Sequence, residues 1–123
     1  MTAPMAKSPT IRIKRIYDSP AYDDGFRVLV DRLWPRGVKK DYAKVDLWAK
    51  EIAPTTALRK WFDHEPAKFD EFRSRYMKEL NSNADALMQI INGAGHSAIT
   101  LLYAARDTAC NHALVLLERL SEN

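Results

Sequence analysis

The segment that most restricts the fold is an uninterrupted apolar run, Ala98–Tyr103, followed at once by a helical pattern. The run has the length of a strand, and its lack of polar alternation is typical of a strand buried on both faces. After a short turn, residues 108–120 repeat apolar side chains with helical spacing, at Ala109, Ala113, Leu116, Leu117 and Leu120. A buried strand, a turn and a helix in this order indicate an α/β fold.

Two further strands are expected near the beginning of the chain. Residues 11–16 alternate apolar and basic side chains, and Phe26–Asp31 is nearly continuous in apolar character. The segment Asp18–Asp24 between them is short for a crossover between parallel strands, so an antiparallel arrangement stays open. Residues 44–50 also alternate, which favours a third strand, although a short amphipathic helix fits nearly as well.

Three helices are expected in the middle of the chain. Hydroxyl groups at Thr55 and Thr56 can cap a short helix that ends near Phe62. A second helix begins at Pro66, since proline suits a first helical turn. Its apolar face contains Phe69, Phe72, Tyr76 and Leu80, which is the pattern of a core face. A third helix is expected over 84–91, ending at Asn92 and Gly93.

These elements predict one small α/β domain with about four strands in an at least partly parallel sheet and helices packed against it. The chain has 123 residues, which suits one core. Residues 1–9 are expected to form a flexible tail before a domain at 10–123. A single cysteine excludes an internal disulfide, and the start of the chain lacks the apolar core of a signal peptide, so a cytoplasmic location without a membrane span is expected.

Long ordered motifs in this sequence resemble a known family. The chain looks like the short, YeaO-like branch of DUF488, a family of unknown function. The similarity covers nearly the whole chain and is carried by Arg15–Asp18, Asp24–Gly37, Trp48–Pro54, Leu58–Phe62 and Thr100–Asp107, and by Asn111–Ala113. The resemblance also implies that the second and last strands are neighbours.

The resemblance also shows where this chain departs from its longer relatives. These carry a cysteine at the end of the last strand, a glutamate nearby and a Cys-His-Arg triplet in the following helix. Here the corresponding positions hold Tyr103, Ala105, Asn111 and Ala113, and only His112 of the triplet is kept. Thiol chemistry and a cysteine-bound metal are therefore not expected. Cys110 is one position away, about 100° around a helix, so a packing role is favoured.

No metal or cofactor site is expected. The three histidines lack the spacing of metal ligands, and His64 and His96 are read as surface or loop residues. Gly93 and Gly95 lie before a strand, where a dinucleotide fingerprint would have to follow one.

The candidate site lies where the strands end. The expected ligand-binding side chains follow the second and the last strand, and the free N–H groups of the last helix are expected beside them. These residues are Arg32, Trp34, Arg36, Arg106, Asp107 and Asn111. The candidate catalytic side chains are His112 as acid or base, Tyr103 as an orienting group, and Asp31. A structural alternative is that Asp31 pairs with Arg106 or Arg32 in a static network that orders the loop.

Two functions are therefore compatible with the sequence. The first is a site for a phosphate or carboxylate ligand, because arginines bind such anions with two parallel hydrogen bonds, and whether it is catalytic is left open. The second is a non-enzymatic module that binds nucleic acid or an acidic protein. It is suggested by a net charge of +3 and by the basic residues of the first sixty positions, but nucleic acid is not favoured. The sequence leaves the ligand and the oligomeric state open.

Overall fold

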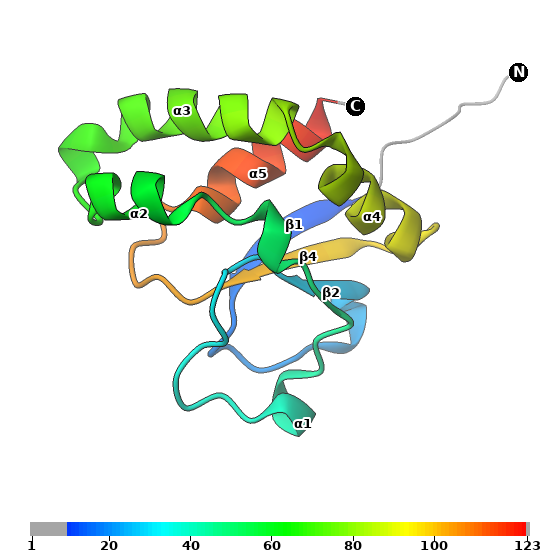
Figure 1. The fold of residues 1–123 in the computed structure, drawn as a ribbon. Helices are drawn as coiled ribbons and strands as arrows, with labels where there is room; N and C mark the ends of the chain where they lie inside the picture. The colour runs from blue at the N-terminus through cyan, green and yellow to red at the C-terminus, as the bar shows by residue number, and fades with distance from the viewer. Residues whose placement is uncertain (1–9, 123) are drawn as a thin grey trace, which may run out of the picture.

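A computed structural model describes residues 10–122, and its centre is a four-stranded sheet (Figure 1). The strands are β1 (Ile11–Arg15), β2 (Phe26–Leu29), β3 (Leu47–Trp48) and β4 (Ile99–Tyr103). Their order across the sheet is β1-β4-β2-β3, and each neighbouring pair is parallel. All four carboxyl ends therefore lie at one edge of the sheet. The fold is α/β, as the sequence predicts.

The central position of β4 follows from its apolar sequence. Every residue of this strand is buried, as expected for a strand with a sheet neighbour on each side and covered faces. By contrast, β1 is only partly buried along its length and occupies an edge, where its alternating basic residues are tolerated. The sequence pattern thus distinguishes the central strand from the edge strand.

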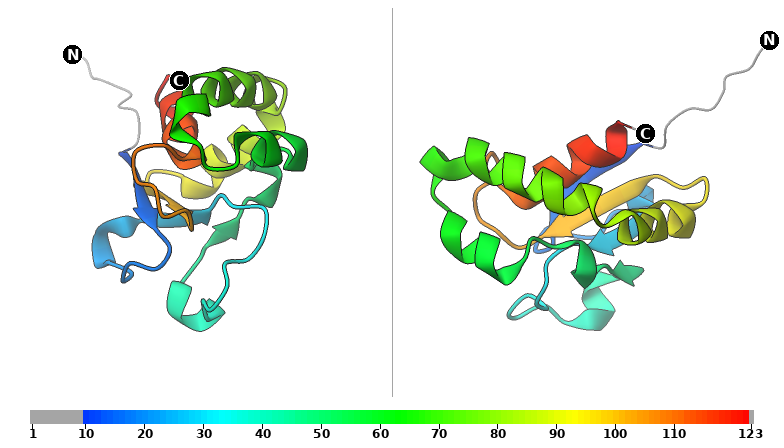
Figure 2. Two further views of the ribbon diagram at one scale, coloured as in Figure 1. Left: turned by 90° about the vertical axis from the view of Figure 1, so that its left-hand side faces the viewer. Right: turned by 45° about the horizontal axis from the view of Figure 1, so that its top comes forward.

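Four helices cover one face of the sheet (Figures 1 and 2). They are α2 (Thr56–Phe62), α3 (Phe69–Asn81), α4 (Ala84–Ala94) and α5 (His112–Ser121), and a 3₁₀ turn at Pro66–Lys68 leads into α3. The aromatic face expected for α3 is confirmed, because Phe72, Tyr76 and Leu80 are buried in the main core. The Phe72 ring stacks on Phe62 of α2 with centroids 4.4 Å apart. The cap of α2 is also confirmed, as the Thr55 hydroxyl accepts a hydrogen bond from Leu58 N–H.

The opposite face is covered by loops and by the short helix α1 (Lys40–Ala43) (Figure 2). A small second core forms here from Ile16, Leu29, Ala43 and Leu102. Trp34 and Trp48 pack beside it, edge to face, with ring centroids 5.5 Å apart. Successive side chains of a strand point to opposite faces of the sheet. Val28 and Leu101 accordingly lie in the main core, and Leu29 and Leu102 lie in the second core.

The first two strands are parallel and are separated by β4, so an antiparallel arrangement is wrong. Residues 16–25 join them with a single 3₁₀ turn, Tyr22–Asp24, instead of a full helix. An extended chain spans about 3.3 Å per residue, and two strand spacings are about 10 Å, so this segment is long enough to cross β4 and return. Crossovers between parallel strands usually contain an α-helix and have a dozen or more residues, whereas this shorter one contains only the 3₁₀ turn.

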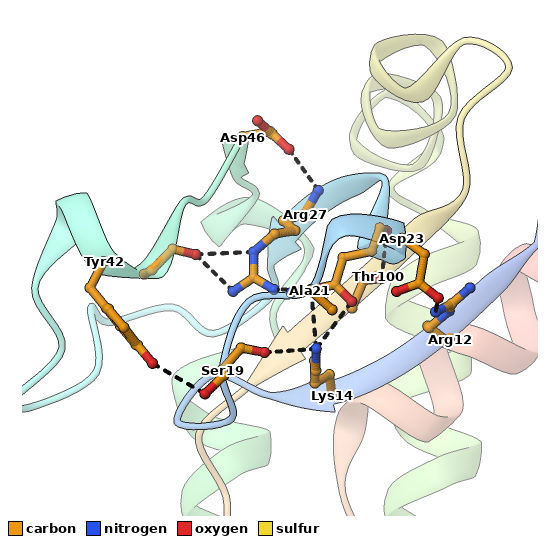
Figure 3. A network of polar contacts seen from close by, with 11 residues as sticks. Arg12, Lys14, Ser19, Ala21, Asp23, Arg27, Tyr42, Asp46 and Thr100 are labelled. Carbon is orange, nitrogen blue, oxygen red and sulfur yellow. Dashed lines mark hydrogen bonds and ion pairs between the residues drawn. The ribbon is translucent and has the colours of Figure 1, made fainter.

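A buried ionic network holds this crossover against the sheet (Figure 3). The Asp24 carboxylate forms ion pairs with Arg27 of β2 and Lys14 of β1, and it accepts a hydrogen bond from Ala21 N–H. Thr100 of β4 donates to the Asp24 carbonyl over 2.7 Å. Asp24 therefore connects three strands, and Arg27 extends the network to the end of α1 through hydrogen bonds to Ala43 O.

Residues 44–50 form a strand, but a short one. Only Leu47 and Trp48 pair with β2, opposite Val28 and Leu29. The remainder of the segment is not extended, because Lys44 is left-handed with φ of 51° and Lys50 begins a 3₁₀ turn, Lys50–Ile52. The alternating sequence pattern thus predicts the strand correctly but overestimates its length.

Helix α4 continues through Asn92 and Gly93 to Ala94, so the expected end at these two residues is wrong. A Cβ atom at Gly93 would lie 2.6 Å from the Phe26 ring, which shows that this glycine allows the helix to approach the sheet. The residue that ends the helix is Gly95, with φ of 59°. Within residues 10–122, no helix combines the length and apolar character needed to cross a membrane. The tail expected at residues 1–9 lies outside the described residues.

Replacing Asp24 with asparagine should strongly destabilise the fold. The substitution removes the carboxylate that pairs with the buried guanidinium of Arg27, and an uncompensated buried charge typically costs about 3–5 kcal/mol. Urea denaturation measures this change. The matched control is Asp23→Asn, which removes only an exposed contact with Arg12 and should change the free energy of unfolding by less than about 1 kcal/mol. Equal effects of the two substitutions would contradict the role given to Asp24.

The same carboxylate should make stability depend on pH. Burial raises the pKa of Asp24, but hydrogen bonds from Ala21 N–H, Lys14 and Arg27 outweigh burial, and the pKa lies below its ordinary value. Its contribution is therefore present above the unfolded pKa of about 3.9 and is lost as pH falls through the folded pKa. Unfolding free energies measured from pH 6 to pH 3 should fall more steeply for the wild-type chain than for Asp24→Asn.

Candidate functional site

A pocket of about 580 Å³ opens at the carboxyl edge of the sheet, on the side covered by the helices. Its walls come from the segments after β2 and β4, from the chain before α2, and from α2, α3 and the start of α5. The lining residues are Asp31, Arg32, Leu33, Ala53, Pro54, Arg59, Phe62, His64, Phe72, Ala104, Ala105, Arg106, Asp107, Cys110, Asn111 and His112. The volume lies within the range of small-molecule sites.

Asp31 follows β2, and His112 begins the helix that follows β4. Because β2 and β4 are neighbours in the sheet, the two side chains lie close together beside this pocket. One carboxylate oxygen of Asp31, Oδ2, accepts a hydrogen bond from Ala104 N–H over 3.1 Å and so joins the two strand ends. The Asp31 carbonyl accepts a hydrogen bond from the Trp48 indole over 2.9 Å. The residue is thus held from both sides, by β4 through its carboxylate and by β3 through its backbone.

The His112 ring is bound to the end of β2. Its Nε2 atom lies 3.1 Å from Val30 O, with which it forms a hydrogen bond. Because a carbonyl oxygen can only accept, this bond requires the proton on Nε2. Asp31 Oδ1 is also 3.1 Å from Nε2, an ion-pair distance when the ring is protonated, but this oxygen has no hydrogen-bond partner among the described residues.

Arg32 contributes a second buried polar atom without a partner. Its Nη2 donates to the carbonyls of Ala53 and Pro54, which ties the end of β2 to the segment before α2. Its Nε is buried and has no hydrogen-bond partner within residues 10–122. Both Asp31 and Arg32 influence the pKa of Tyr76, which burial raises well above its ordinary value. Asp31 and Arg32 therefore each contribute one buried polar atom without a hydrogen-bond partner among residues 10–122, and both residues line the pocket.

The outer part of the pocket is cationic. Arg59 of α2, Arg106 after β4 and His64 are exposed. Neither guanidinium group forms a hydrogen bond or an ion pair within the described part of the chain, so both are available to a ligand. Arg59 and the apolar residues Phe62 and Phe72 are absent from the set that the sequence indicates. A helical pattern identifies them as surface or core residues, and only the packing of α2 and α3 brings them to the strand ends.

The loop before α5 is more ordered than the sequence suggests. The helix begins at His112 instead of Thr108. Asp107 accepts hydrogen bonds from Ala109 N–H and Cys110 N–H, and these bonds lower its pKa. Asn111 caps the helix by accepting from Leu114 N–H, and its amide donates to Asp107 O. N–H groups expected to be free for a ligand therefore bind side chains of the loop itself.

Three of the residues proposed from the sequence lie outside the pocket lining. Tyr103 is buried in the main core, where burial raises its pKa. Trp34 donates its indole hydrogen to Val38 O and packs on the opposite face of the sheet. Arg36 is exposed, and its carbonyl accepts from the Tyr17 hydroxyl. The other residues, Asp31, Arg32, Arg106, Asp107, Asn111 and His112, line one pocket.

The pocket combines apolar walls with polar ends. No group of three or more His, Cys, Asp or Glu side chains within residues 10–122 is arranged to hold a metal ion. The cationic rim suits an anionic group, and the walls formed by Leu33, Phe62 and Phe72 suit an apolar body.

Replacing Asn111 with alanine should destabilise the pocket wall by about 1–2 kcal/mol, because the helix loses its cap. Asn111→Ser should recover part of this loss, since a serine hydroxyl can accept from the same helical N–H but cannot donate to Asp107 O. Urea denaturation of both variants measures the difference. If serine and alanine destabilise equally, capping is not the role of Asn111.

Comparison with known proteins gives the chain a family. A family model described as "Inactive DUF488-N3 subclade" matches residues 10–123. The uncharacterized protein Rv3073c of Mycobacterium tuberculosis is 44% identical over 117 residues, which cover 95% of this chain and 98% of that protein. The uncharacterized protein YeaO of Escherichia coli is 46% identical over 110 residues, covering 89% and 96%. No solved structure matches significantly. The chain therefore belongs to the DUF488 family, within the subclade described as inactive.

Proposed function

We propose that this protein binds a small organic anion, a phosphate or a carboxylate, in the pocket at the carboxyl edge of its sheet. The observation that carries the proposal is the pair of exposed guanidinium groups, Arg59 and Arg106, that line the pocket without a partner among residues 10–122. Arginine donates two hydrogen bonds in a fixed geometry that matches both kinds of anion.

The remaining walls favour an anion with an apolar body. Phe62, Phe72 and Leu33 line the same space as the two arginines. An inorganic ion would contact only the rim, whereas a ring attached to the anionic group would also cover apolar surface. The ligand is therefore an organic molecule with an anionic end.

Binding is better supported than catalysis. Of the three catalytic candidates, Tyr103 is in the core, and the Nε2 proton of His112 is used in a bond to Val30 O. Asp31 has one oxygen bound to Ala104 N–H. The family description "Inactive" agrees with a site that recognises a ligand without transforming it.

A role in nucleic-acid binding has less support. Several basic residues of the first sixty positions are engaged within the fold, where they form ion pairs or bind backbone carbonyls. These residues are Lys14, Arg15, Arg27 and Arg32. They are therefore not available to phosphates of a nucleic-acid backbone.

The proposal predicts that phenyl phosphate binds to the protein and that Arg59→Ala and Arg106→Ala each weaken the binding about tenfold, the effect of losing a charge-assisted hydrogen bond. Isothermal titration calorimetry measures these affinities. Lys60→Ala is the matched control, because Lys60 is an exposed cation beside Arg59 that does not line the pocket. It should leave the affinity within about twofold.

Inorganic phosphate should bind more weakly than phenyl phosphate, since it does not cover the apolar walls. Absence of phenyl phosphate binding, or equal loss in Lys60→Ala and Arg59→Ala, would refute the proposed site.

A further inference from the structure

We propose that the ligand of this pocket is a nucleoside monophosphate, with the phosphate at the arginine rim and the polar edge of the base at Asp31 and Arg32. This inference rests on the proposed function and adds the chemistry of the ligand's other end. It comes from two buried polar atoms that have no hydrogen-bond partner among residues 10–122. They are Arg32 Nε and Asp31 Oδ1, which lies 3.1 Å from His112 Nε2.

A buried polar atom without a hydrogen bond is costly, so such atoms are rare and require an explanation. Here an unpartnered acceptor and an unpartnered donor belong to consecutive residues that line the same pocket. Asp31 can accept one more hydrogen bond, and Arg32 Nε–H can donate one. A group that presents a donor next to an acceptor would satisfy both.

The two atoms are buried, whereas the arginines of the anion-binding rim, Arg59 and Arg106, are exposed. We therefore place Asp31 Oδ1 and Arg32 Nε at the inner end of the pocket and the arginines at its mouth. The Asp31 side chain retains 19% of its exposure, but Oδ1 itself is buried, so contact with a ligand requires a rotation of the carboxylate, whose torsion is broad. The pocket therefore has a polar inner end, apolar walls and a cationic rim.

Nucleobases have the required combination of properties. Each base is a flat ring whose edge carries adjacent hydrogen-bond donors and acceptors, and its faces stack on aromatic side chains. Phe62 and Phe72 line the space between the two polar ends. The 5′-phosphate of a nucleoside monophosphate is attached at the other end of the molecule, where it would lie near Arg59 and Arg106.

The test compares AMP, GMP, CMP and UMP with three partial ligands by isothermal titration calorimetry. Phenyl phosphate lacks the polar edge, ribose 5-phosphate lacks the base, and the free nucleosides lack the phosphate. At least one nucleoside monophosphate should bind about tenfold more tightly than phenyl phosphate, as expected for one or two additional buried hydrogen bonds.

Asp31→Asn is the decisive variant, because it replaces the free acceptor with a donor. It should remove the preference for the nucleoside monophosphate, so that the ratio of its affinity to the affinity for phenyl phosphate falls about tenfold. Arg32→Lys is a second variant, which keeps the charge and removes the Nε donor, and it should act in the same way. Circular dichroism confirms folding, and Arg106→Ala should weaken both ligands together.

The outcomes separate this inference from the proposed function. If phenyl phosphate binds through Arg59 and Arg106 but no nucleoside monophosphate binds more tightly, the anion site stands and the nucleotide inference is wrong. Equal loss of both ligands in Asp31→Asn and in Arg32→Lys would also overturn it. If no phosphate compound binds, both proposals fail.

Discussion

The architecture depends on the buried carboxylate of Asp24. This group pairs with Lys14 of β1 and Arg27 of β2, and its residue is bound by Thr100 of β4 (Figure 3). The other polar side-chain contacts of residues 16–23 are exposed, so this carboxylate is the main buried polar group that fixes the path of the connection across β4. The network therefore allows β1 and β2 to lie parallel on either side of β4. That arrangement places the ends of β2 and β4 next to each other, which is the condition for the pocket.

The same neighbouring strand ends explain why Asp31 occupies a special position. It is the residue at which the fold and the candidate site meet, since one carboxylate oxygen holds Ala104 N–H while the other has no hydrogen-bond partner among residues 10–122. Structural hydrogen bonds usually satisfy both oxygens of a buried carboxylate. One oxygen of Asp31 therefore stabilises the contact between the two strand ends, and the other is the atom on which the proposed recognition of a ligand depends.

Sequence patterns predict the elements of this fold better than their arrangement. The apolar run of β4 and the aromatic face of α3 follow from burial, which a local pattern records. The parallel placement of β1 and β2 depends on the buried contacts of Asp24 with Lys14 and Arg27, which no local pattern reveals. The site shows the same division. Strand-end residues such as Arg32 and Arg106 are identifiable, whereas Arg59 reaches the pocket only through the packing of α2.

The Asp24 network and the pocket are separate, so substitutions in the pocket need not affect the network. The Asp24 network lies on the loop-covered face, where it connects β1, β2 and β4 to α1, whereas the pocket lies on the helical side at the carboxyl edge. Arg59 and Arg106 are exposed, and their guanidinium groups have no partners among the described residues, so their substitution leaves the core intact. Effects of changes at such independent positions are generally additive. Residues at the rim of the pocket can therefore change without loss of the fold, whereas Asp31 is constrained by its hydrogen bond to Ala104 N–H.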